Sequence, residues 1–115
     1  MGPAAPYRRV ERREGLMVSS IENRSLLRGT VTGRSPHPSL PGYDVLDVDV
    51  RGTSPVDERP DLLASTVGSR VAVTADRAVL DDTVGPGATV LCTVRRTPDG
   101  AMADRDPGSV RVERR

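Results

Sequence analysis

Apolar and charged residues alternate most regularly over residues 43–50, which read Tyr-Asp-Val-Leu-Asp-Val-Asp-Val. Successive side chains of a strand point to opposite faces, so this period of two predicts a strand with one buried face. The apolar positions change face between Val45 and Leu46. We interpret this change as a β-bulge that bends the strand, with burial of both faces near its start as the alternative. In either case Asp47 and Asp49 project together from the polar side.

Five further segments have the composition of short strands. They are rich in Val, Ala and Thr and lie at residues 26–32, 69–75, 88–96, 101–103 and 110–112. Gly29, inside the first of these segments, predicts a bulge or a sharp coil, which is a device that small barrels use to curl a sheet closed. Residues 16–21 are compatible with either a short strand or the start of a helix.

Proline and glycine concentrate in the connections between these segments. Residues 33–42 contain three prolines and predict a stiff loop. Residues 60–65 could form one or two helical turns, and residues 76–82 could form a short helix or an extended return. Residues 97–100, Thr-Pro-Asp-Gly, predict a tight hairpin turn.

Five or six short strands without a long helical pattern predict an all-β domain. Their order fits a small Greek-key barrel of the OB type, with at most one or two short helical turns. A compact six-stranded sandwich is the alternative, and we favour the barrel because of Gly29 and the change of face after Val45. We expect residues 16–115 to form this single small barrel domain and residues 1–15 to form a flexible, charged N-terminal segment.

The absence of Phe and Trp changes the expected core. Hydrophobic residues make up 36% of the 115 residues, and Tyr7 and Tyr43 are the only aromatic ones. The core must therefore be thin and rich in valine, which suits the half-buried surface of a sheet. All 17 basic residues are arginine, which we interpret as the mark of a GC-rich, bacterial genome.

The net charge of +1 is unevenly distributed along the chain. Residues 1–34 hold seven arginines against three acidic residues, residues 35–110 hold seven against twelve, and residues 111–115 hold three against one. An acidic body between basic ends gives no general attraction to nucleic acid or to an anionic membrane. No apolar run approaches the roughly 20 residues that span a bilayer, and the first residues lack the apolar core of a signal peptide. We therefore expect a cytoplasmic protein without a membrane segment.

Side chains suited to catalysis are sparse. His37, the single histidine, lies between two prolines and close to two serines. An active serine needs a held base and an oxyanion hole, and no Gly-X-Ser-X-Gly motif is present. Cys92, the single cysteine, lies within a predicted strand and is expected to be a buried, unreactive hydrophobe. We therefore predict that the protein is not an enzyme.

The acidic residues and glycines match no metal or phosphate motif. A hard cation needs several converging carboxylates, but strand geometry sends Asp44 to the face opposite Asp47. The segment Gly85-Pro-Gly87 is too short for a phosphate loop and carries a proline where amides would be needed. We expect no metal site and no cofactor.

Nucleic-acid binding is the alternative function that the fold class implies. OB barrels often carry single strands on a face that combines basic residues with aromatic platforms. Only Tyr43 could serve as such a platform, and the acidic body opposes a polyanion. Five arginines on or beside the predicted strands could gather on one face: Arg24, Arg28, Arg34, Arg95 and Arg96.

Docking on a protein partner, or self-association, is the function that we predict first. An acidic strand face with Asp47 and Asp49, a rigid loop that carries His37, and basic termini suit such a surface. Self-association could take the form of a homodimer through an edge strand such as residues 110–114. We expect the working surface where the proline loop meets Tyr43.

Overall fold

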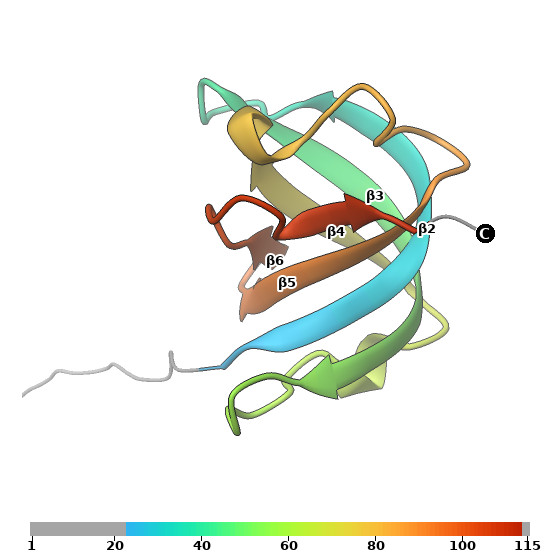
Figure 1. The fold of residues 1–115 in the computed structure, drawn as a ribbon, viewed down its shortest axis with the longest axis vertical. Coiled ribbons are helices and arrows are strands. Elements are labelled where there is room, and N and C mark those ends of the chain that lie inside the picture. The colour runs from blue at the N-terminus through green and yellow to red at the C-terminus, as the bar shows by residue number, and fades with distance from the viewer. Residues whose placement is uncertain (1–22, 114–115) are drawn as a thin grey trace, which may run out of the picture.

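Residues 23–113 are described by the computed structural model, in which strands make up most of the chain (Figure 1). The predictions for residues 1–15 and 16–21 lie outside the described residues. Six strands and two short 3-10 turns follow one another: β2 Ser25–Pro36, β3 Tyr43–Pro55, η3 Ala64–Thr66, β4 Arg70–Asp76, η4 Arg77–Val79, β5 Thr89–Thr97, β6 Gly100–Ala103 and β7 Val110–Val112.

Five of these strands close into a barrel. They lie in the order β2-β3-β4-β6-β5, and β5 pairs again with β2. All neighbours are antiparallel except β4 and β6, which run parallel over two residue pairs, Val73–Ala101 and Thr74–Met102. The sixth strand, β7, runs beside β5 (Figure 1). The predicted all-β barrel of five to six strands with two short helical turns is thereby confirmed.

The predicted bulge within residues 43–50 is wrong. β3 pairs with β4 without interruption from Tyr43 to Asp49. Asp44 lies on the inner face together with Leu46, so buried and less buried residues alternate regularly along the strand. The sequence pattern suggested a bulge because a charged residue occupies one of the inner positions. Val45 is half-buried on the outer face.

The irregularities lie instead in the pairing of β2 with β3. One register shift falls beside Gly29, where a bulge was predicted, but its extra residue is Arg51 of β3; the second shift, between Val31 and Gly33, leaves Thr32 of β2 as the extra residue. The proline loop is also shorter than predicted, because β2 continues to Pro36. The predicted hairpin turn at residues 97–100 is confirmed, with Thr97 paired to Gly100.

The core consists of small aliphatic side chains without an aromatic ring. The strands contribute alternating residues of their inner faces, and two further core residues come from the connections: Leu63, 1% exposed, and Val84, 2% exposed. Leu63 precedes η3 and fills one end of the barrel, and Val84 fills the other. A thin, valine-rich core was predicted, and it is observed.

Between β6 and β7 the chain leaves the sheet as a loop and then rejoins it. The N–H of Asp104 donates to the carbonyl of Thr93 at 2.9 Å, and the N–H of Thr93 donates to the carbonyl of Ser109 at 2.8 Å. Thr93 therefore bonds both ends of the loop, and the Ser109 hydroxyl donates to the carbonyl of Asp104 at 2.5 Å. Residues 104–109 thus form a loop whose two ends are both hydrogen-bonded to Thr93, so that β6 and β7 pair with the same edge of β5.

Gly29 permits the close approach of β2 to β3. A Cβ atom at this position would overlap the carbonyl oxygen of Asp49 and would lie 2.5 Å from Val48 Cγ1. Gly52, by contrast, has no heavy atom within 4 Å of such a Cβ. The two glycines differ in the space around them, so they form a matched pair for substitution.

Gly29→Ala should lower the free energy of unfolding by about 2 kcal/mol or more, because the strands must separate to admit the methyl group. Gly52→Ala should change it by no more than about 0.5 kcal/mol. Urea unfolding followed by far-ultraviolet circular dichroism measures both values. Equal midpoints for the two variants would show that β2 and β3 do not need this approach.

Candidate functional site

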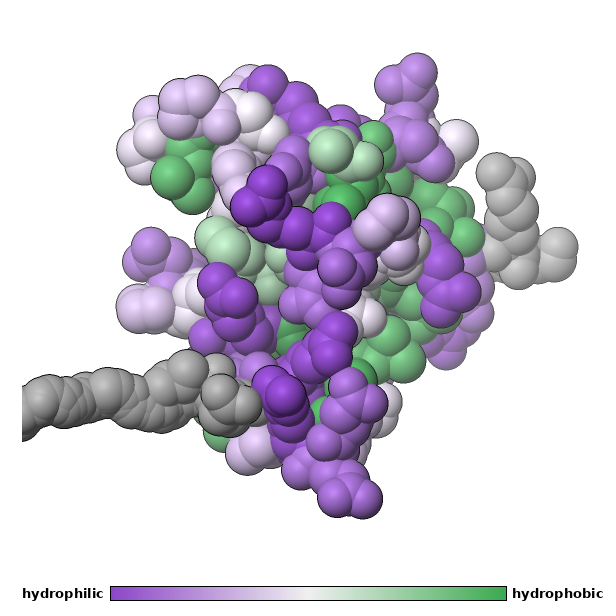
Figure 2. Space-filling view, turned by 60° about the vertical axis from the view of Figure 1, so that its left-hand side comes forward, coloured by the Kyte–Doolittle hydropathy of each residue, from purple (hydrophilic) through white to green (hydrophobic). Residues whose placement is uncertain are grey.

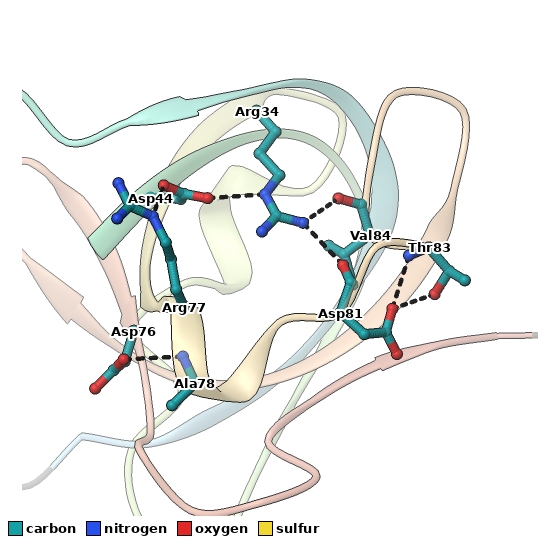
Figure 3. A network of polar contacts seen from close by, with 8 residues as sticks. All are labelled: Arg34, Asp44, Asp76, Arg77, Ala78, Asp81, Thr83 and Val84. Atoms are coloured by element: carbon teal, nitrogen blue, oxygen red, sulfur yellow. Dashed lines mark hydrogen bonds and ion pairs between the residues drawn. The ribbon is translucent and has the colours of Figure 1, made fainter. Parts of the chain in front are cut away.

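A buried carboxylate, Asp44, lies at one end of the barrel between two arginines (Figure 3). Nε of Arg34 donates to Oδ2 at 2.8 Å, and Nε of Arg77 donates to Oδ1 at 2.7 Å. The Asp44 side chain is only 8% exposed. Arg34 comes from the end of β2 and Arg77 begins η4, so this carboxylate ties together three segments of the chain.

Arg34 also reaches across the end of the barrel. Its Nη1 donates to the backbone carbonyls of Asp81 and Val84, each at 2.9 Å (Figure 3). These bonds hold Val84 where its side chain fills the barrel end. Arg34 was predicted among the binding residues, but its guanidinium N–H groups donate hydrogen bonds within the protein itself.

The environment of Asp44 keeps its carboxylate charged. Burial disfavours the charged form, but the hydrogen bonds and charges of Arg77 and Arg34 outweigh burial and hold the pKa of Asp44 below its usual value. A carboxylate that stays ionised between two fixed cations is a poor general acid or base at neutral pH. The Asp44 cluster is a structural clamp.

Asp61, which is half-buried, forms a second cluster at the opposite end, without an arginine. Its carboxylate accepts hydrogen bonds from the Ser25 hydroxyl at 2.6 Å and the Thr53 hydroxyl at 2.8 Å. The N–H of Leu63 also donates to it, at 3.1 Å. Burial opposes the charge, and these three donors hold the pKa of Asp61 below its usual value. The carboxylate thus fixes the β3–β4 connection so that Leu63 points into the barrel.

Acidic side chains gather on the outer face of β3 and β4. Asp47 and Asp49 both lie there, as their spacing predicted, and Asp76 lies opposite Tyr43 at the other end of the pair. The carboxylate of Asp49 pairs with Arg70 Nε at 2.9 Å, and Asp47 is exposed. Oδ2 of Asp76 lies 3.5 Å from Nε of Arg105, so only Asp47 among these three carboxylates has no arginine partner within residues 23–113.

His37 and Tyr43 are brought together where the proline loop meets β3. The N–H of His37 donates to the carbonyl of Tyr43 at 2.9 Å. Its Nδ1 accepts from the N–H groups of Ser39 and Leu40, each at 3.0 Å, so the ring holds the turn. The Ser39 hydroxyl lies 3.5 Å from Nδ1, which is too long for a nucleophile activated by a base.

The five arginines considered for nucleic-acid binding do not form one face. Arg34 belongs to the Asp44 clamp, and Arg28 lies on the outer side of β2, where its Nε pairs with Glu113 at 2.7 Å. The remaining three lie near the start of β2 and the end of β5: Arg24, Arg95 and Arg96.

A hollow of about 480 Å³ lies at this end, and we call it the arginine hollow. Its lining includes the following six residues, among others: Asn23, Arg24, Arg59, Arg95, Met102 and Arg105. Arg59 and Arg105 were not predicted, because both lie in connections, where periodicity carries no signal. Their positions follow only from how the connections fold back on the barrel.

Arg24 is held firmly in the wall of the arginine hollow. Its Nε and Nη2 donate to Asp104 Oδ2 at 3.0 and 2.5 Å, and its Nη1 donates to Asp57 at 2.8 Å. The hydrogen bond and charge of Asp104 raise the pKa of Arg24. Arg96 lies outside the lining, and its Nη1 donates to the carbonyl of Leu62 at 3.0 Å.

Reactive groups are few in the described part of the chain. Cys92 is fully buried, and burial raises the pKa of its thiol to about 12. Within residues 23–113, no three His, Cys, Asp or Glu side chains are placed to hold a metal ion. In the same range, no helix is long and apolar enough to cross a membrane.

No protein-family model matches the chain, and no curated protein or solved structure matches it at a significant level. The arrangement of its own residues is therefore the ground for assigning a function.

Asp44→Asn should lower the free energy of unfolding at neutral pH by about 2–4 kcal/mol, because two guanidinium groups lose their carboxylate. The lowered folded-state pKa means that the clamp stabilises the fold above the unfolded-state pKa of about 3.9. This contribution is lost as the pH falls through the folded-state pKa, so the variant should lose less stability on acidification than the natural protein.

Urea unfolding at neutral pH and near pH 3 measures both effects. Asp49→Asn is the matched control, since it removes a carboxylate whose ion pair is exposed to solvent, and it should change stability much less. Equal losses in the two variants would contradict the role of Asp44 as a clamp.

Proposed function

We propose that this protein is a non-catalytic binding module that docks on a protein partner by strand addition. The observation that carries the proposal is the unpaired edge of β7. β7 pairs with β5 on one side, and no strand within residues 23–113 pairs with its other side. An unpaired edge offers backbone donors and acceptors to an extended segment of another chain.

The ladder between β5 and β7 identifies the backbone groups that face the free side. The N–H of Thr93 donates to the carbonyl of Ser109, and the N–H of Glu113 donates to the carbonyl of Thr89. Bonded and non-bonded residues alternate along an antiparallel ladder. Two residues of β7 therefore turn their N–H and C=O groups away from β5: Val110 and Val112.

The charge on the outer face of β3 and β4 favours a protein over a nucleic acid as the partner of that face. The order of the five strands and the parallel β4–β6 pair support the analogy with OB barrels, which bind oligonucleotides on the face of their second and third strands. Those strands correspond here to β3 and β4, whose outer face carries Asp47, Asp49 and Asp76. Arg70 and Arg105 pair with Asp49 and Asp76, so this face has no excess of positive charge to attract phosphates.

The surrounding surface is largely polar. Hydrophilic residues cover much of the face in Figure 2, and hydrophobic residues appear between them. A partner that adds a strand gains its affinity from backbone hydrogen bonds and therefore needs no large apolar patch. A second copy of the chain, bound edge to edge, is one form that this docking can take.

Val112→Pro removes an N–H that faces the free edge, and the ladder bonds to β5 from the neighbouring residues remain. It should abolish the complex or weaken it by at least about tenfold, which is the loss expected for a directly bonded edge. Val112→Ala keeps the N–H, trims the same side chain and should retain binding. Light scattering across a concentration series measures self-association, and a pull-down from the protein's own cell extract measures capture of a partner.

Thermal unfolding of both variants ensures that each is folded before binding is compared. Loss of the complex in both variants would indicate that the valine side chain, and not the strand edge, makes the contact. A monomer at every concentration, together with no partner retained on the column, would overturn the proposal.

A further inference from the structure

The far end of β7 carries a self-complementary sequence. Residues 111–113 read Arg-Val-Glu. Arg111 and Glu113 lie on the outer face, and Val112 lies on the inner face, where it packs against the core. When two such triplets run antiparallel with valine opposite valine, each arginine faces a glutamate. The edge strand of one molecule therefore matches the edge strand of another.

The backbone of β7 permits this register. Antiparallel strands alternate hydrogen-bonded residue pairs with non-bonded pairs. Val112 turns its N–H and C=O to the free side, so two Val112 residues placed opposite each other form a bonded pair. Arg111 then lies opposite Glu113 of the second copy in a non-bonded pair. Side chains are closest in such pairs, because their Cα atoms are about 4.5 Å apart.

Charge distinguishes this register from its neighbours. Sliding the second strand by two residues in either direction keeps the backbone groups in phase but changes the opposing side chains. One shift places Arg111 opposite Arg111 of the second copy, and the other places Glu113 opposite Glu113. Like charges directly opposite each other destabilise a strand pair. Of these three registers, the one centred on Val112 pairs opposite charges.

Arg111 lacks a carboxylate within its own chain. It is exposed, and none of the carboxylates in the described part of the chain pairs with it. Glu113 accepts hydrogen bonds from Nε and Nη2 of Arg28 at 2.7 and 3.0 Å, and its side chain is 34% exposed. A carboxylate has about four acceptor sites, so Glu113 can bind Arg28 of its own chain and Arg111 of a second copy together.

We propose that a second copy of this chain occupies the free edge, with β7 paired to β7 across a two-fold axis at Val112. This inference rests on the proposed strand addition and names its partner. Such a contact joins the same patch of both molecules and closes at two subunits. β7 is already extended in the fold, so its described residues need no further ordering to pair.

Reversing each charge tests the register. Arg111→Glu places a glutamate opposite Glu113 in both pairs, and Glu113→Arg places an arginine opposite Arg111. Each variant alone should self-associate at least about tenfold more weakly than the natural protein. An equimolar mixture of the two variants restores opposite charges in both pairs and should recover about the natural affinity. Sedimentation equilibrium of the full chains across a concentration series measures these affinities.

The chain that carries both substitutions is the control for folding. It loses the Arg28–Glu113 ion pair as Glu113→Arg does, but two copies of it again pair opposite charges, so its self-association should recover. Thermal unfolding ensures that each variant is folded. Glu11→Arg is the control for sequence, because residues 9–11 repeat Arg-Val-Glu outside the described residues. It should leave self-association unchanged.

Four results would overturn this dimer. These are a natural protein that stays monomeric at every concentration, unchanged self-association of Arg111→Glu, no recovery in both the mixture and the doubly substituted chain, and loss of self-association in Glu11→Arg. A monomer that retains another protein, with retention lost in Val112→Pro, would overturn the second copy alone and leave strand addition intact. Self-association that Val112→Pro does not weaken would contradict strand addition itself.

Discussion

The buried carboxylate of Asp44 is the interaction that holds one end of this barrel together. An ion removed from water is costly unless its charge and lone pairs are satisfied, and Arg34 and Arg77 satisfy both oxygens. Arg34 then extends the same cluster to the carbonyl of Val84, whose side chain fills the barrel end. One polar centre thus positions the apolar residue that completes the core.

At the other end of the barrel a carboxylate again holds a connection in place, but its hydrogen-bond donors are not arginines. Asp61 takes its donors from two hydroxyl groups and one backbone N–H, and it fixes Leu63 in the barrel. A core without aromatic rings has little apolar area to stabilise long connections. The carboxylates of Asp44 and Asp61 compensate by holding a connection in place at each end of the barrel. Gly29 lets the strands approach closely enough for small side chains to fill the interior.

Many charged side chains of the outer surface are paired. Asp49 of β3 pairs with Arg70 of β4, and Arg24 in the wall of the arginine hollow pairs with Asp104. The candidate binding residues accordingly have unequal roles. His37 and Arg34 are engaged in local structure, Arg28 pairs with Glu113, and Arg95 retains an open guanidinium.

Local sequence alone determined the strands and their faces, because alternation, Gly29 and the turn at residues 97–100 act over a few neighbouring residues. It also located Asp47 and Asp49 on one face. It placed Asp44 on the opposite face, but it could not identify the arginines that make a buried carboxylate possible there, because they lie 10 and 33 residues away and only the fold brings them to it. The arginine hollow has the same origin: Arg24, Arg59, Arg95 and Arg105 are distant in the chain and meet because a closed barrel joins its first strand to its later ones.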